Sequence, residues 1–81
     1  MRYFVYILRS LKDRTLYIGI SQDPEKRLQE HNSGTSKYTK GHRPYKLLCK
    51  EEYCDRIVAR GREKYLKTGH GRDEIRKIIP P

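Results

Sequence analysis

The sequence lacks tryptophan and has one phenylalanine, one methionine and two cysteines among its 81 residues. It also lacks a long apolar run, because the stretch 4–8 is far shorter than the ~18 residues of a transmembrane helix. No signal-peptide pattern is present. We therefore expect a soluble protein without a membrane partner, located in the cytoplasm, in the bacterial cytosol or nucleoid.

The two cysteines are too few for a disulfide scaffold. Cys49 and Cys54 fit the reduced thiols of a cytosolic protein. With His42 and His70 they offer potential zinc ligands, but the Cys-x4-Cys spacing has no paired His-x3-5-His. We interpret both cysteines as core or surface thiols, with zinc binding as the weaker alternative.

Acidic residues are also scarce. Against 10 Asp and Glu stand 19 Lys and Arg, which gives a net charge of +9. The basic residues are spread along the chain, which predicts an ordered basic surface. This charge favours nucleic acid as the partner, with an acidic protein or an anionic membrane as weaker alternatives. The length predicts a single domain, 1–81.

Two runs of β-branched and aromatic residues, 4–8 and 16–20, are joined by a polar loop. Their alternation predicts an antiparallel hairpin. Tyr6 and Tyr17 would then be neighbours, with Tyr17 on the same, less apolar face as Gly19. Because glycine has no side chain, we expect a backbone or ligand to approach there. The simpler alternative is two core tyrosines.

A helix start follows the hairpin. Asp23 caps it and a proline occupies its first position. The helix runs for about ten residues, and Gly34 ends it. Arg27 and His31, four residues apart, point the same way. The alternative is a solvated basic helix in which Arg27 pairs with Glu30.

Residues 34–44 have no hydrophobic period and mix small, basic and hydroxyl-bearing side chains. Charges, hydroxyls and a stacking ring are how proteins contact nucleic acid without reading bases. The stretch therefore predicts a phosphate-binding loop, although a merely soluble loop would look similar. The candidate contacts are Lys37, Tyr38, Thr39, Lys40 and Arg43.

The remaining chain predicts a strand over 45–52 and two helices. The first helix begins after Asp55, continues to about Lys67 and ends at Gly69. After Gly71 a short helix carries an apolar stripe of Ile75, Ile78 and Ile79. The fold class is therefore α+β, a three-stranded antiparallel sheet flanked by three helices in the order β-β-α-β-α-α.

The longer of these helices has a carboxylate at the edge of its apolar face. Glu63 needs a cation partner or a metal there, because buried unpaired carboxylates are costly. Lys67, four residues on, is the ordinary partner. Gly61 costs ~1 kcal/mol relative to alanine, which we interpret as close packing against the sheet. The expected inward stripe is Val58, Ala59, Arg62, Tyr65 and Leu66.

Taken in order, five segments resemble the GIY-YIG nuclease domain, and closely its small stand-alone members. Each segment alone is weak, but five in this order and spacing are specific. They are Phe4-Val5-Tyr6, Tyr17-Ile18-Gly19, Arg27 within 25–28, His31-Asn32-Ser33-Gly34 followed by Lys37-Tyr38-Thr39, and Arg62-Glu63-Lys64-Tyr65-Leu66-Lys67.

The resemblance implies a divalent-metal-dependent DNA endonuclease, structure-selective or weakly sequence-specific, acting in DNA repair or recombination. It implies Glu63 as the single protein ligand of Mg²⁺ or Mn²⁺, and Arg27 as a clamp on the scissile phosphate. Tyr6 and Tyr17 become hydroxyls at the attack site. Mg²⁺ keeps most of its waters, so one carboxylate suits it. The fork of arginine matches phosphate oxygens.

Three features depart from the family pattern. Phe4-Val5 replaces Gly-Ile, and the asparagine near the C-terminus of several members has no counterpart. Ile20 stands where the excision-repair branch has a lysine that assists the second tyrosine. A tyrosine becomes a base only if cations favour its phenolate. We expect Arg27 and the metal to do so, with His31 as a further candidate base.

Two functions compete, an endonuclease and a non-catalytic basic nucleic-acid-binding module on the same fold. The charge supports both. The co-occurrence of Tyr6, Tyr17, Arg27 and Glu63 favours the nuclease, since a binding protein does not need the carboxylate. A third hypothesis, an adaptor for an acidic protein, explains only the charge. The expected substrate is branched, damaged or duplex DNA, with specificity from the loop 34–44, from substrate shape or from a protein partner.

Overall fold

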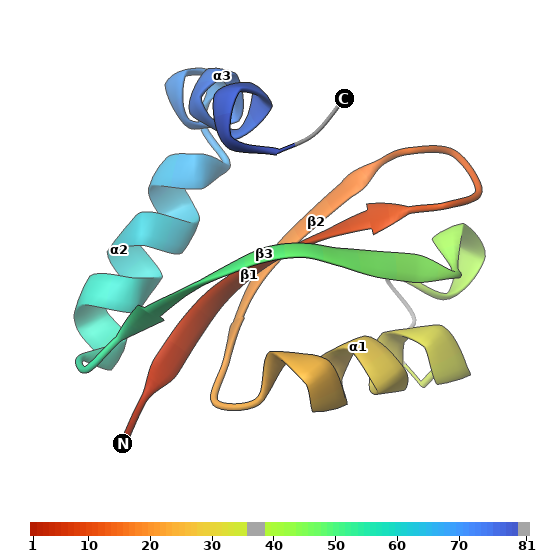
Figure 1. The fold of residues 1–81 in the computed structure, drawn as a ribbon, viewed down its shortest axis with the longest axis horizontal. Coiled ribbons are helices and arrows are strands. Elements are labelled where there is room, and N and C mark those ends of the chain that lie inside the picture. The colour runs from red at the N-terminus through yellow and green to blue at the C-terminus, as the bar shows by residue number, and fades with distance from the viewer. Residues whose placement is uncertain (36–38, 80–81) are drawn as a thin grey trace.

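A three-stranded sheet divides the molecule, with α1 on one face and α2 and α3 on the other (Figure 1). The computed structural model describes residues 1–35 and 39–79. The α+β class and the β-β-α-β-α-α order confirm the prediction. The elements are β1 (Tyr3–Ser10), β2 (Leu16–Ser21), α1 (Pro24–Ser33), the 3-10 helix η1 (Lys40–His42), β3 (Tyr45–Tyr53), α2 (Arg56–Leu66) and α3 (Gly69–Ile78).

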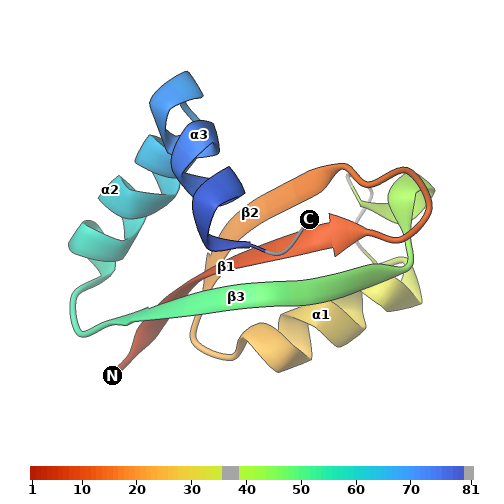
Figure 2. The same ribbon diagram turned by 45° about the horizontal axis from the view of Figure 1, so that its top comes forward.

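The sheet has the order β2-β1-β3 and is antiparallel throughout, so β1 is its central strand (Figure 2). In the hairpin, Tyr6 pairs with Gly19 and Leu8 with Tyr17. On the other side the register shifts after Ile7, which leaves one extra residue, Leu48, in β3. Such a bulge bends a strand and strengthens its twist.

Side chains of β1 alternate between two separate cores. Val5 and Ile7 point toward α2 and α3, where Ala59, Leu66 and Ile75 complete a buried cluster. On the opposite face Tyr6 and Leu8 pack with β3 and α1. Each large buried side chain contributes ~1.5 to 3 kcal/mol to folding. One strand therefore supports both halves of the molecule. The second cluster is Tyr6, Leu8 and Tyr45, with Tyr17, Leu28 and Leu47 packed against it.

The apolar face of α2 is narrower than predicted. Ala59 and Leu66 are buried, but Val58 is 54% and Tyr65 42% exposed, so the expectation that they point inward is wrong. The two buried positions are seven residues, or two turns, apart. Charged side chains fill the same face between them, which leaves the flanking apolar residues outside. Ile78 in α3 is likewise 48% exposed, contrary to the expected stripe.

The boundary between α2 and α3 also differs from the prediction. Gly69 begins α3 instead of ending α2, because the Thr68 hydroxyl accepts a hydrogen bond from the Gly71 amide at 3.1 Å and caps the helix. A Cβ at Gly71 would overlap with the Tyr65 carbonyl oxygen. A Cβ at Gly61 would meet no atom within 4 Å, so the interpretation of Gly61 as a packing residue is wrong. The close approach occurs at Gly71.

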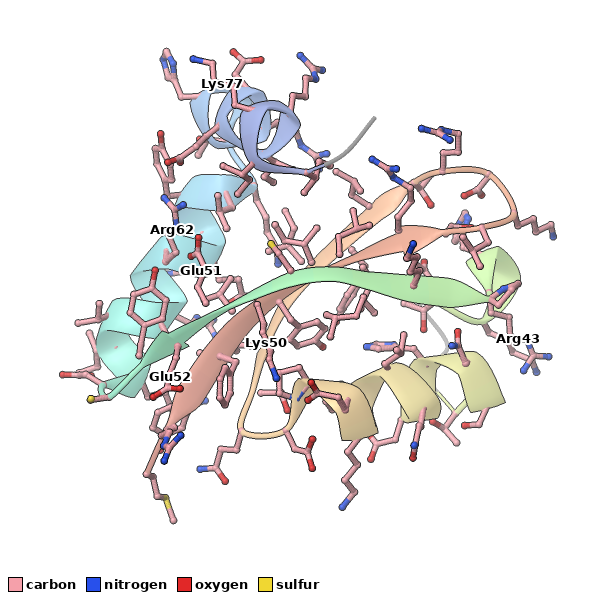
Figure 3. The ribbon with its side chains drawn as sticks, viewed as in Figure 1. Arg43, Lys50, Glu51, Glu52, Arg62 and Lys77 are labelled. Atoms are coloured by element: carbon pink, nitrogen blue, oxygen red, sulfur yellow. The ribbon has the colours of Figure 1, made fainter. Side chains whose placement is uncertain are left out.

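Arg62 of α2 connects its own helix to β3 and to α3 through hydrogen-bonded ion pairs. The Arg62 Nε and Nη2 atoms donate to the two Glu51 carboxylate oxygens of β3 at 2.9 and 3.1 Å (Figure 3). Its Nη1 donates to Glu74 of α3 at 2.9 Å. This bidentate geometry explains why a charged residue is tolerated on the inward face of α2.

Candidate active site

Four aromatic rings from four elements meet on the α1 face of the sheet. Tyr6 of β1 and Tyr17 of β2 are neighbours as predicted, with ring centroids 6.2 Å apart. His31 of α1 lies 4.7 Å from the Tyr17 ring and 6.2 Å from that of Tyr45 in β3. The hairpin register and the helical position of His31 therefore bring together three of the predicted site residues.

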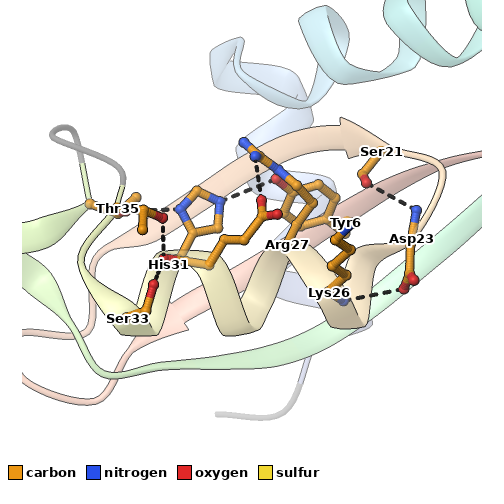
Figure 4. Close-up of polar contacts among 10 residues, drawn as sticks. Tyr6, Ser21, Asp23, Lys26, Arg27, His31, Ser33 and Thr35 are labelled. Atoms are coloured by element: carbon orange, nitrogen blue, oxygen red, sulfur yellow. Dashed lines mark hydrogen bonds and ion pairs between the residues drawn. The ribbon is translucent and has the colours of Figure 1, made fainter.

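Tyr6 is fully buried among polar partners. Its hydroxyl lies 3.3 Å from His31 Nε2 (Figure 4) and also hydrogen-bonds with the Arg27 guanidinium. Burial raises the pKa of Tyr6 to about 12, although the Arg27 hydrogen bond and charge oppose the rise. Tyr6 therefore keeps its proton at neutral and mildly alkaline pH and acts as a neutral hydroxyl.

His31 is buried and held at both ring nitrogens. Its Nδ1 lies 2.8 Å from the Thr39 hydroxyl oxygen, and Nε2 faces Tyr6. Burial, with the Arg27 charge, lowers the pKa of His31, so the ring is neutral at pH 7. With only 1% of its surface exposed, the ring has no face open to a water molecule. The structure places His31 as a support for Tyr6 and not as a base that meets solvent.

The Tyr6 side chain occupies the space that a side chain at position 19 would need. A Cβ there would lie 2.6 Å from the Tyr6 hydroxyl oxygen and 3.0 Å from Tyr17 Cε1. The sequence predicts that a backbone or a ligand approaches in this space beside Tyr17. That expectation is wrong, because the Tyr6 ring already fills it. The glycine allows the two tyrosine hydroxyls to converge at the hairpin.

Arg27 lies at the solvent side of this cluster. Its side chain is 43% exposed, and its Nη1 donates to Glu30 at 2.7 Å. The predicted Arg27–Glu30 pair is therefore present, but the same guanidinium also reaches inward to Tyr6, which raises its pKa. Arginine has five N–H donors, so further donors are available to an incoming anion.

Glu63 approaches from the other layer. Its side chain is 13% exposed, and its Oε2 accepts from Lys67 Nζ at 3.2 Å, the ion pair considered from the sequence. Lys67 in turn lines a cavity of about 390 Å³ with Tyr17 and Arg72 at the β2 edge. Glu63 therefore pairs with a residue that lines the same cavity as Tyr17.

The donor set at Glu63 fits a hard divalent cation. Its Oε1 forms no hydrogen bond to the described residues, and carboxylate oxygen is a ligand that Mg²⁺ and Mn²⁺ prefer. Within residues 1–35 and 39–79, no three His, Cys, Asp or Glu side chains gather as a metal cluster. A metal bound here would have Glu63 as its one carboxylate, with water and phosphate oxygens completing its shell.

The described residues of the predicted phosphate-binding loop differ in their exposure to solvent. Lys37 and Tyr38 lie outside the described residues. Thr39 is fully buried against His31, so the expectation that its hydroxyl contacts phosphate is wrong. Lys40 and Arg43 are exposed, and the Arg43 guanidinium lies against Gly34 at the end of α1.

The contacts that fix the segment next to Thr39 were not predicted from the sequence. The hairpin loop binds η1 through the Lys12 ammonium, which donates to the Gly41 carbonyl at 3.2 Å, and through an Asp13–His42 pair. The Ser10 hydroxyl donates to the His42 carbonyl. These contacts join residues about thirty positions apart, so no local pattern could reveal them.

Asn32 is a second residue that sequence analysis left without a role. Its side-chain Nδ2 donates to the Tyr45 carbonyl at 3.1 Å, and its Oδ1 accepts from the Tyr45 amide at 2.6 Å. This pair of bonds fixes the end of α1 to the start of β3. Asn32 thereby sets the height of His31, the preceding residue, above the sheet.

The comparisons with known proteins agree with this arrangement. Residues 2–77 match the family model described as the GIY-YIG catalytic domain. A UPF0213 protein of Staphylococcus saprophyticus is 36% identical over 78 residues, covering 95% of this chain and 94% of the relative. A UPF0213 protein of Clostridium perfringens is 43% identical over 65 residues, covering 79% and 69%. The solution NMR structure of a UPF0213 protein of Bacillus halodurans is similar, with a TM-score of 0.58, 29% identity and coverage of 95% and 84%.

Proposed function

This chain belongs to the GIY-YIG catalytic domain family, and from that premise we propose that it is a divalent-metal-dependent DNA endonuclease. It hydrolyses phosphodiester bonds in branched, damaged or duplex DNA with little sequence specificity, in DNA repair or recombination in the cytoplasm. The observation that carries the proposal is the meeting of the buried Tyr6, the partly buried Tyr17 and the partly exposed Arg27 on the α1 face of the sheet. A protein partner adds specificity.

Arg27 binds the scissile phosphate. It is the only one of these three groups with a permanent charge, and its planar fork matches two phosphate oxygens. The Tyr6 hydroxyl fixes one side of the guanidinium, which orients the fork before substrate arrives. In the transition state extra negative charge collects on the phosphoryl oxygens, so the contact with Arg27 strengthens there.

The two tyrosines have different roles because their surroundings differ. Tyr6, with its pKa raised to about 12, keeps its proton and serves as a hydrogen-bond donor. Tyr17 is only partly buried and also borders the cavity at the β2 edge, so this side of the site is open to water. As a water molecule attacks phosphorus, one ester P–O bond breaks. The Tyr17 hydroxyl accepts the proton that the water loses as its own proton passes to a neighbouring water molecule, and bulk water supplies the proton that the leaving oxygen takes up.

Glu63 would hold the metal. Mg²⁺ or Mn²⁺ supplies Lewis-acid charge to the phosphate and the leaving oxygen when bound. Lys67 holds the Glu63 carboxylate in place at 3.2 Å until then, and it keeps a positive charge beside the substrate path. The carboxylate is therefore held in place by a residue that lines the cavity.

The decisive experiment compares the wild-type protein with Glu63→Gln from the same preparation on supercoiled, branched and single-stranded DNA. We expect cleavage only with Mg²⁺ or Mn²⁺ and none with Glu63→Gln, which keeps the shape and removes the charge. DNA binding without metal should persist in the variant. Contaminating nuclease would survive the substitution, and a variant that cuts at the wild-type rate would leave Glu63 as only the partner of Lys67.

A non-catalytic nucleic-acid-binding module is the second candidate. One observation favours it: the Glu63–Lys67 ion pair satisfies a carboxylate oxygen without any metal. This function predicts salt-dependent DNA binding together with no cleavage at any Mg²⁺ or Mn²⁺ concentration. The same set of DNA substrates therefore separates the two candidates.

A further inference from the structure

Two adjoining hollows lie along β2, which is an edge strand of the sheet. The first, of about 390 Å³, is lined by Leu16, Tyr17, Ile18, Lys67 and Arg72. The second, of about 520 Å³, is lined by Arg14, Thr15, Leu16, His42, Tyr45 and Arg72. Because Leu16 and Arg72 line both, the hollows form one continuous surface, which we call the β2-edge groove.

The charge of the β2-edge groove has one sign. Lys67, Arg72 and Arg14 line it, and none of its lining side chains is acidic. The carboxylates next in sequence to the two arginines and the carboxylate beside Lys67 are all paired: Asp13 with His42, Asp73 with Arg76 and Glu63 with Lys67. Neither Arg14 nor Arg72 forms an ion pair with a carboxylate of the described residues. Their guanidinium groups therefore have all their donors available to an external anion.

The two arginines come from different elements, and the fold fixes each beside the strand. Arg14 ends the hairpin loop in a left-handed backbone conformation, with φ of 65° and its amide donating to the Ser10 carbonyl at 2.9 Å. Arg72 lies in the first turn of α3, and its amide donates to the Thr68 carbonyl at 2.9 Å. Only tertiary packing brings them to the same groove.

The cations of the groove are divided between its two hollows. Lys67 and Arg72 line the hollow beside Tyr17, and Arg14 lines the other together with Arg72. Cations at both hollows suit a chain of phosphates better than a single small anion, because successive phosphates of one strand each carry a negative charge.

We propose that the β2-edge groove holds the sugar-phosphate backbone of the DNA strand on one side of the cleavage position, with Arg72 and Arg14 contacting phosphates that lead away from Tyr17. The proposal rests on the proposed nuclease function, which puts the scissile phosphate at Tyr17. The contacts are to phosphate alone, so they position the strand without reading its sequence.

The test measures DNA binding without metal, where no cleavage can occur. Arg72→Gln and Arg14→Gln should each lower the slope of log K against log salt on duplex DNA by ~0.9, the loss of one phosphate contact. Lys77→Gln is the matched control: it removes the same charge from α3, where Lys77 points away from the sheet (Figure 3). Circular dichroism confirms the fold of each variant, since all three side chains are exposed.

A second measurement locates the strand. Neutral methylphosphonate groups replace single phosphates on either side of the cleavage position. We expect weaker binding for substitutions on one side only, and no further weakening by the same substitutions in the Arg72→Gln protein. Non-additivity of this kind reports direct contact.

The outcomes separate this proposal from the nuclease function. A wild-type protein that binds but never cleaves would overturn the nuclease and leave the groove supported by its salt slopes. A protein that cleaves while both arginine variants keep the slope of Lys77→Gln would overturn the groove alone. Absence of DNA binding at low salt would also overturn it and favour an acidic protein segment as the occupant.

Discussion

Tyr6 and Tyr17 show how one amino acid takes two roles within a hairpin. Tyr6 has buried hydrogen-bond partners in Arg27 and His31, whereas Tyr17 borders an open cavity. Removing the oxygen from each tyrosine should therefore have different consequences. Under the proposed function, the Tyr6 hydroxyl supports the structure of the site and the Tyr17 hydroxyl takes part in the reaction.

We expect Tyr17→Phe to keep the fold and DNA binding and to lower the cleavage rate by ~10² to 10⁴, the range of general-base catalysis. Tyr6→Phe should instead lower the free energy of unfolding by ~1 to 3 kcal/mol, because it leaves the buried His31 Nε2 without a partner. Urea unfolding and single-turnover cleavage of both variants check this pair. Equal cleavage rates for Tyr17→Phe and wild type would show that Tyr17 has only a packing role.

Gly19→Ala tests whether the glycine positions Tyr6. The new methyl group would lie 2.6 Å from the Tyr6 hydroxyl oxygen, so the ring must move away from His31. We expect a loss of ~1 to 3 kcal/mol in unfolding free energy, as for other overpacked sites, together with reduced cleavage. Gly41→Ala is the control, because a Cβ there meets nothing within 4 Å. Unchanged stability in Gly19→Ala would contradict this role.

Helices α2 and α3 make close contact at Gly71 of α3. A second glycine, Gly61 of α2, makes no such contact. Gly71 allows the α3 backbone to approach the last turn of α2, while Gly61 faces open space. Both glycines lie inside helices, where glycine lowers stability relative to alanine. Their substitutions should therefore have opposite signs.

Gly61→Ala should raise the free energy of unfolding by ~0.5 to 1 kcal/mol, since alanine is the better helix former and no clash arises. Gly71→Ala should lower it by ~1 to 3 kcal/mol, because the Tyr65 carbonyl oxygen occupies the site of the new methyl group. Thermal melts of the two variants provide the measurement. A stabilised Gly71→Ala protein would mean that α3 shifts freely on α2.

The molecule as a whole depends on charge as well as on its two small cores. Arg62 joins α2 to β3 and α3 through Glu51 and Glu74, and Lys50 of β3 pairs with Glu25 of α1 at 2.6 Å. These pairs connect layers that share little apolar surface at their margins. Acid should therefore weaken the whole fold.

Glu51 sets the pH range of this effect. Arg62 holds the pKa of the Glu51 carboxyl below its usual value, although burial opposes the shift. Because the folded-state pKa is lower, the stabilisation is complete above the unfolded pKa of ~4.3 and is lost as pH falls through the folded value. The stability difference between wild type and Glu51→Gln should be largest near pH 7 and should shrink below about pH 4.

Melting temperatures between pH 7 and pH 3 check this prediction. Glu52→Gln serves as the neighbouring control. Within residues 1–35 and 39–79, Glu52 pairs only with the exposed Arg2, at 3.6 Å, so this variant should follow the wild-type profile. A Glu51→Gln protein that loses stability in parallel with wild type down to pH 3 would show that the Arg62 bridge does not govern acid unfolding.

Much of this architecture could be predicted because it follows from local patterns. Alternation identified the hairpin, and helical spacing placed Arg27 and His31 on one side of α1. The wrong predictions concern side chains whose positions are determined by tertiary contacts. The Tyr6 ring fills the space at Gly19, Thr39 turns inward to His31, and nothing local distinguishes Gly61 from Gly71.

The placement of the C-terminal helix was the other feature beyond prediction. Its apolar period indicates that it docks, but no pattern says which edge of the sheet it approaches. For the same reason Arg72 could not be assigned to a site from the sequence. Its position beside Tyr17 depends on how α3 packs against α2 and β2.

The central strand also has a consequence for how this family can change over time. Val5 and Ile7 face the layer of α2 and α3, whereas Tyr6 and Leu8 face the layer of α1. Consecutive residues of one strand therefore face different neighbours, an apolar cluster on one side and the polar partners of Tyr6 on the other. A saturation scan read for protein abundance and for DNA cleavage should vary with a period of two along β1: apolar exchanges at Val5 and Ile7 should preserve both readouts, whereas apolar exchanges at Tyr6, which remove the hydroxyl that contacts His31, should lower both.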